Sequence, residues 1–299
     1  MPVEAVHLSG LVDSLATSSA WVRRATSGPY HRAARLGALF VDLPYFDRFS
    51  LAVARYALRQ PQMPSRWGHV FHQDTPIALG RLLGECGHAL TQQTATREAG
   101  ETLTALSLGY ISHAALDTAM HPHINRLARE RAERTGLDPS VEHQEIEKFH
   151  SLLFHQQRFG HDPMGTQTMR VYIEVDGRCL GEDGPVADAV QGALRSLHGQ
   201  APTRQEFRRY ARGYLSYARL IGNSIMGPRI GPPAAREAAR FEVFTQFDFL
   251  GRFSEAVAKS RAYLDALGAY LADGLFDASA RAALARLIPE GSIDPDPTS

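Results

Sequence analysis

The stretch Ser107–Asn125, SLGYISHAALDTAMHPHIN, combines an apolar helical pattern with polar residues at intervals of four: His113, Asp117 and His121. Residues four apart on an α-helix lie on one face, with Cβ atoms about 5–6 Å from each other. Apolar and aromatic side chains flank this line, so we expect it to face the interior. A single histidine there is more often a hydrogen-bonded core residue. A buried carboxylate between two imidazoles needs compensation, however, and the triplet predicts a bound metal cation.

A second helix is predicted over SVEHQEIEKFHSLLFHQQRF, after a charged segment that Gly136 and Pro139 interrupt. His143 and Glu147 repeat the spacing of four in this helix, again beside apolar side chains. One such pair occurs often by chance. Next to the first helix, it extends the candidate metal site.

Further candidate ligands lie toward the N-terminus. His7 is near the start of an amphipathic segment that runs from Ala5 to about Arg24. Asp42 comes at the end of an apolar helical pattern, which we expect to stop near Pro44. An aspartate in this position is commonly a turn or cap residue, so its role as a ligand depends on the rest of the site.

Two histidines precede the next predicted helix. His69 and His72 are three residues apart, which permits a shared helical face, although one of them can be a ligand without the other. Asp74 and Thr75 have the pattern of an N-terminal cap with Pro76 just inside the following helix. We therefore expect one ligand just before this helix begins.

Composition narrows the classes of protein to be considered. Lys plus Arg and Asp plus Glu both number 32, so no sequence-wide basic charge favours nucleic acid or anionic membranes. Cys86 and Cys179 are too few for a disulfide framework and suit a reducing compartment. No signal peptide pattern is seen, and no stretch approaches the roughly 18 apolar residues of a membrane span. We expect a cytoplasmic protein without a transmembrane segment, and no oligomeric state follows.

The predicted fold class is all-α. We expect a metal-binding domain over residues 1–161, a mainly helical C-terminal region over 162–290 and a disordered tail over 291–299. Alternation in the segment TMRVYIEVDGRCLGEDGP predicts one small β-hairpin with its turn at Asp176-Gly177. Of 13 histidines, only one lies beyond His161, so the metal chemistry is expected in the first region.

The candidate ligands suffice for two or three metal ions. Nitrogen and carboxylate donors without thiolates suit zinc first, with iron, manganese or cobalt as substitutes. Such clusters commonly hydrolyse phosphate esters, because metal ions neutralise phosphate oxygens and lower the pKa of bound water. The candidates are His7, Asp42, His69 or His72, His113, Asp117, His121 or His123, His143 and Glu147.

The stretch LGYISHAALDTAMHPHIN resembles the signature of the zinc-dependent phospholipase C family, in which a helix with HxxxD runs into a Pro/His turn and a helix with HxxxE follows. The segments AVHLSGLVDSLA, LGALFVDLPYF and FHQDTP resemble the family's N-terminal histidine, aspartate and histidine in the same order. The arrangement is similar to that of fungal zinc nucleases as well. The resemblance covers about residues 1–160 and implies an all-α fold with a three-zinc site.

The resemblance also implies roles for individual residues. One zinc would be held by Asp42, His72, His113 and Asp117. Asp117 would bridge to a second zinc held by His7, and Asp42 would orient the attacking water as a base. These assignments follow from the family pattern and not from the spacing of the residues.

A remaining zinc would be held by His143, Glu147 and a histidine of the Pro/His turn. The family places that histidine six residues after the bridging aspartate, which favours His123. Helical geometry alone favours His121. Both stay candidates, with His123 preferred.

The expected function is metal-dependent hydrolysis of a phosphodiester by metal-activated water, with a small phosphodiester or a phospholipid head group as substrate. Nucleic acid is a further candidate substrate. The alternative is a non-catalytic helical scaffold or partner-binding protein that a metal stabilises. A lesser alternative is an HD-type phosphohydrolase centred on His161-Asp162, which Pro163 and Gly165 make a poor helix.

Overall fold

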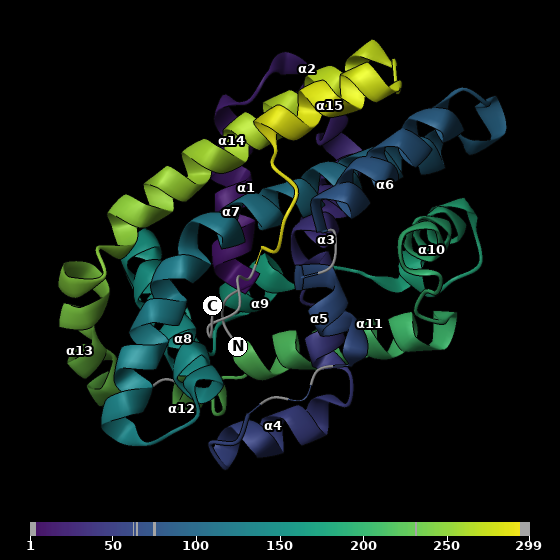
Figure 1. The fold of residues 1–299 in the computed structure, drawn as a ribbon. Helices are drawn as coiled ribbons and strands as arrows, with labels where there is room; N and C mark the ends of the chain where they lie inside the picture. Colours follow the sequence, from purple (N-terminus) through teal and green to yellow (C-terminus); the bar gives the residue numbers. More distant parts are fainter. Residues whose placement is uncertain (1–3, 62, 64, 74–75, 231, 294–299) are drawn as a thin grey trace.

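The computed structural model describes residues 4–61, 63, 65–73, 76–230 and 232–293. In these residues the chain forms helices joined by turns, and they contain no strand, which confirms the all-α prediction (Figure 1). The helices of the first half are α1 (Glu4–Thr17), α2 (Ala20–Ala25), α3 (His31–Phe40), α4 (Phe49–Ala57), α5 (Arg66–Gln73), α6 (Pro76–Thr91), α7 (Arg97–Thr135) and α8 (Pro139–Phe159). Those of the second half are α9 (Gln167–Ile173), α10 (Pro185–His198), α11 (Arg204–Ile221), α12 (Gly227–Ile230), α13 (Pro233–Phe241), α14 (Phe249–Asp273) and α15 (Ala278–Leu287).

The long helix α7 is the centre of the fold. It runs through the middle of the molecule in Figure 1 and packs against α3, α6, α8 and α14. It spans 39 residues and passes through Pro122 without ending. The expected Pro/His turn is therefore absent, and α7 ends only at Gly136, which has a φ of +72°. Pro122 cannot donate a backbone hydrogen bond, but extensive packing on both sides of it keeps one continuous helix.

Glycines allow α3 and α7 to cross at very short range. A Cβ atom on Gly109 would lie 1.8 Å from the carbonyl oxygen of Ala34. A Cβ atom on Gly37 would lie 2.0 Å from the carbonyl oxygen of Leu106. Any side chain at either position would force the helices apart. The crossing brings the C-terminal end of α3, just before Asp42, against α7.

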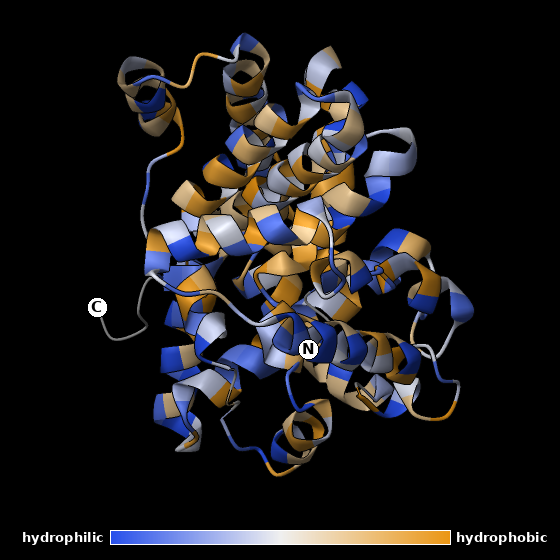
Figure 2. Ribbon diagram, turned by 90° about the vertical axis from the view of Figure 1, so that its right-hand side faces the viewer, coloured by the Kyte–Doolittle hydropathy of each residue, from blue (hydrophilic) through white to orange (hydrophobic). Residues whose placement is uncertain are grey.

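The two halves of the sequence share one hydrophobic core. A single cluster of buried apolar side chains draws on residues from Ala5 to Ile293, and a second cluster joins α7 and α8 to α14. Figure 2 shows the apolar residues gathered in the interior of the helical layers. The predicted boundary at residue 161 therefore does not divide the core. None of the helices in the described residues combines the length and apolar composition needed to cross a lipid bilayer.

The predicted β-hairpin is wrong. Its first half forms α9, and residues Arg178–Leu180 form a short 3-10 helix. An alternating strand would place Met169, Val171 and Ile173 on one face, but Val171 is 67% exposed while the other two are buried. Met169 and Ile173 are four residues apart and therefore lie on the same face of a helix. Packing of this face against the core favours the helix over the strand.

The expected disorder of the tail is wrong at its start, because Ile293 is fully buried. Residues 294–299 lie outside the described part of the chain, as do Asp74 and Thr75, the predicted cap of α6. The segment from Ala5 to Arg24 forms two helices instead of one. Ser19 separates them, and its side chain accepts a hydrogen bond from the backbone N–H of Val22 at the start of α2.

Candidate metal centre

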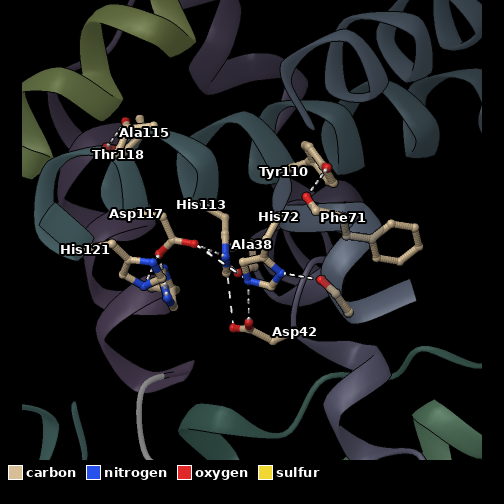
Figure 3. A network of polar contacts seen from close by, with 12 residues as sticks. Ala38, Asp42, Phe71, His72, Tyr110, His113, Ala115, Asp117, Thr118 and His121 are labelled. Atoms are coloured by element: carbon tan, nitrogen blue, oxygen red, sulfur yellow. Dashed lines mark hydrogen bonds and ion pairs between the residues drawn. The ribbon is translucent and has the colours of Figure 1, made fainter. Parts of the chain in front are cut away.

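The carboxylate of Asp117 lies at the centre of a group of histidines, and its residue is only 2% exposed. His113 and His121 approach it from the same helix, at the predicted spacing, and His72 approaches from α5 (Figure 3). His7 comes from α1. The Nε2 atoms lie 2.8 Å away for His113, 3.4 Å for His121, 3.5 Å for His7 and 4.0 Å for His72. Three helices thus supply nitrogen donors to one buried carboxylate.

Backbone and side-chain oxygens orient three of the histidine rings. The Nδ1 atom donates a hydrogen bond in each: His72 to the Gly68 carbonyl (2.7 Å), His113 to the Ala38 carbonyl (2.8 Å) and His143 to Oδ1 of Asn125 (2.7 Å). Because these oxygens only accept, the proton is on Nδ1 and the lone pair of the neutral ring is on Nε2. Histidines that bind metals are typically oriented in this way.

Two adjacent sets of donor atoms share His113. His7, His113 and Asp117 form one set, and Asp42, His72 and His113 form the other, each with ligand atoms within 4.8 Å of one another. Oδ1 of Asp42 lies 3.4 Å from Nε2 of His72. The structure therefore brings together the five residues that the resemblance assigns to the first two zinc ions.

The third set of donor atoms joins α7 to α8 and consists of His121, His143 and Glu147. Oε1 of Glu147 lies 3.4 Å from Nε2 of His121 and 3.1 Å from Nε2 of His143. The two imidazole rings meet edge to face at 5.3 Å. Both predicted i,i+4 relations thus converge on one site.

Two candidates lie outside these sets. His123 was preferred over His121, but its ring packs edge to face against Phe247 at 6.5 Å. Because α7 stays helical through Pro122, two residues turn the helix by about 200° and direct His123 away from the site. His69 is exposed on α5, and only His72 of that pair joins a set.

Buried polar atoms that make no hydrogen bond indicate that a cation fits this site. In the described residues, Nδ1 of His7, Nε2 of His113 and Oδ2 of Asp117 are buried and make no hydrogen bond. The last two atoms are 2.8 Å apart, but they lie outside hydrogen-bond geometry. Such atoms are rare in folded proteins. The described His, Asp and Glu groups could therefore hold metal ions, and nitrogen and oxygen donors suit a divalent transition metal.

The pKa shifts express the same electrostatic balance. Burial lowers the pKa of His113, but Asp117 and Asp42 outweigh burial and raise it to about 9. Burial, followed by the charge of His113, lowers the pKa of His7 to about 4. Burial would raise the pKa of Asp117, but the histidines hold it well below its usual range. A positive charge is therefore favoured beside this carboxylate, as a proton on His113 or as a metal ion.

A small cavity of about 30 Å³, large enough for a water molecule, adjoins Asp117. Its polar walls are His7, Asp117, His121, Glu147 and His150. His150 was not predicted, although it lies three residues after Glu147 and seven after His143, on the same face of α8. Its ring nitrogens make no hydrogen bond within the described residues, and burial lowers its pKa to about 3.

The HD dipeptide lies away from the three sets. His161 is exposed, and Oδ2 of Asp162 accepts a hydrogen bond of 2.6 Å from the buried guanidinium of Arg236. Asp162 also accepts a hydrogen bond from the backbone N–H of Met164. This carboxylate serves a turn and an ion pair, so its contacts do not favour the HD-type interpretation.

Comparison of the chain with protein-family models, with curated proteins and with solved structures finds no match. The case for a metal centre therefore depends on its own geometry.

Proposed function

We propose that this chain is a zinc-dependent hydrolase of phosphodiesters, similar in its site to the zinc-dependent phospholipase C family. The observation that carries the proposal is the orientation of the histidines around Asp117. The Nδ1 atoms of His72 and His113 are held by backbone carbonyl oxygens, and the Nε2 atoms of both rings face carboxylates. Two or three zinc ions would occupy the sets of donor atoms, with iron, manganese or cobalt as substitutes.

Divalent cations bound here would neutralise phosphate oxygens and lower the pKa of coordinated water toward neutrality. The side chains of the site would position the metal ions and the attacking water, and would transfer protons. The side chain of Asp42 is 18% exposed, compared with 2% for Asp117. We assign to Asp42 the orientation and deprotonation of the attacking water, and to Asp117 the bridging position between donor sets.

The open edge of the site suggests where a phosphodiester approaches. The side chains of Asp42, His143 and Glu147 are the more exposed members, at 18%, 19% and 13%. A small phosphodiester or a phospholipid head group would reach the site along this edge. The adjoining cavity is too small to enclose such a substrate.

The test combines metal analysis with turnover of bis-nitrophenyl phosphate and of a phosphatidylcholine analogue. We expect two or three zinc ions per chain, and hydrolysis that chelation abolishes and zinc restores. His113→Ala should remove both metal and activity, while His69→Ala, which changes an exposed histidine on α5, should change neither. Hydrolysis that survives both chelation and His113→Ala would exclude the proposal.

The second candidate function is a helical scaffold that a metal stabilises without catalysis. The near-complete burial of His113, Asp117 and His7 favours it, because structural metal sites are closed. Metal-replete protein that melts earlier after chelation, yet turns over none of the phosphodiesters, would decide for this candidate.

A further inference from the structure

The segment after α15 returns across the helices toward the centre of the molecule, as the yellow trace in Figure 1 shows. It ends beside α5. Ile288 and Ile293 are 1% and 0% exposed, whereas the four residues between them are exposed. Two buried isoleucines thus anchor the two ends of a short exposed segment. The second isoleucine packs beside α5, the helix that carries His72.

The end of this segment binds the backbone of His72. The N–H of Ile293 donates a hydrogen bond of 2.9 Å to the His72 carbonyl, and the hydroxyl of Ser292 donates another of 3.3 Å to the same oxygen. His72 lies in the last turn of α5, where carbonyls have no donor within the helix. A segment 220 residues away in sequence therefore caps this helix.

The capped residue is the one whose ring faces Asp42. Its Nδ1 atom is fixed by the Gly68 carbonyl one turn earlier, so the ring position depends on the geometry of the last turn of α5. The helix has only eight residues, and isolated helices of this length are unstable. Contacts with other elements must hold it in place.

We propose that Ser292 and Ile293 are positioning residues for His72, and that this C-terminal contact maintains the Asp42–His72–His113 set. The inference rests on the metal centre of the proposed function. The His121–His143–Glu147 set belongs to α7 and α8 and not to α5, so it serves as an internal reference. Loss of the contact should weaken one metal set and spare the other.

The experiment compares two truncations of the full chain. One ends after Glu290 and removes the contact; the other ends after Ile293 and keeps it. We expect the shorter chain to lose one zinc equivalent, or at least tenfold in affinity by chelator competition, while the longer truncation matches the wild type. His72→Ala should remove the same equivalent, and combining it with the shorter truncation should remove no more. Equal zinc binding by the two truncations would overturn the proposal.

Point variants separate positioning from general stability. Ile293→Ala and Leu284→Ala each remove a buried apolar side chain, 0% and 5% exposed, and both should lower the melting temperature. Only Ile293→Ala should change zinc affinity, and equal effects of the two on zinc would contradict a positioning role.

Hydrogen exchange gives a readout that does not require metal. The amides of α5 should exchange at least tenfold faster in the chain ending at Glu290 than in the chain ending at Ile293, and those of α8 should not change. If the wild-type protein binds no metal, the proposed function is refuted. Hydrogen exchange would still test the contact between the C-terminal segment and α5. Unchanged exchange in α5 would refute the contact itself.

Discussion

His113 and His150 are both almost fully buried, yet their surroundings are opposite. His113 donates from Nδ1 to a backbone carbonyl and places Nε2 2.8 Å from Asp117, and its pKa is raised to about 9. His150 packs its ring 4.2 Å from Phe247 and 5.2 Å from Phe249, and burial lowers its pKa to about 3. Burial alone makes a histidine neutral.

Neighbours, and not burial, therefore separate a candidate metal ligand from a core histidine in the described residues. A histidine that binds a metal typically has an oxygen that fixes its ring and a carboxylate nearby that shares the cation. His72 and His143 have both, as does His113. His150 lines the same cavity as Asp117 but has aromatic neighbours instead. The two environments lead to different expectations for mutation and metal removal.

Asp117→Asn should have the largest effect, because this carboxylate faces four histidines. The amide keeps the size of the side chain but removes its charge, so we expect loss of at least one metal ion per chain. Breaking a buried pair costs about 3–5 kcal/mol in the free energy of unfolding. Elemental analysis and urea unfolding measure the two effects. The control is Asp162→Asn, which lies outside the three donor sets and should keep all its metal. Retention of metal by Asp117→Asn would show that His113 is a core residue like His150.

Removal of metal should be the next largest effect. At a free metal concentration of 1,000 Kd, binding stabilises the native state by about 4 kcal/mol. With an unfolding entropy of about 2.1 cal/mol/K per residue, that corresponds to roughly 6–7 °C in melting temperature for 299 residues. Thermal unfolding with and without a chelator measures the change, and readdition of zinc should reverse it. Superimposable unfolding curves would show that protons alone, without a metal ion, balance the negative charge of Asp117.

His121→Ala and His123→Ala form a matched pair on one helix. His121 lies 3.4 Å from Glu147, whereas His123 packs against Phe247, so only the first should reduce metal affinity. The reduction should exceed the roughly 10–100-fold that changes to outer-shell partners cause. Chelator competition measures it. The reverse order of effects would restore the assignment that the family resemblance implies.

His150→Phe should have the smallest effect and should appear only in acid. The depressed pKa means that the unfolded chain binds a proton on His150 between pH 6.5 and about 3 while the native chain does not. Stability of the wild type therefore falls as pH decreases through this range, by at most about 1.4 kcal/mol per pH unit for one group. The variant should lose stability less steeply in acid, measured by urea unfolding at several pH values. Its metal content should stay unchanged; a loss of zinc would make His150 a ligand.

The local part of the site could be read from residue spacing. His113, Asp117 and His121, and likewise His143 and Glu147, are related by the helical repeat, which the backbone sets without help from the rest of the chain. The all-α class follows from the same periodicity. Where periodicity was ambiguous, as around Val171, the predicted hairpin was wrong, because packing and not pattern decides between a strand and a short helix.

The sequence alone thus established the two helices with candidate ligands four residues apart, and the nitrogen-rich donor set that they form. Tertiary structure decided the rest: the meeting of His7, Asp42 and His72 with Asp117, the choice of His121 over His123, and the capping of α5 by Ile293. The reason is physical. Spacing along a helix fixes only neighbours within one or two turns, while the crossing of α3 and α7 and the continuity of α7 through Pro122 arise from contacts between residues far apart in the chain.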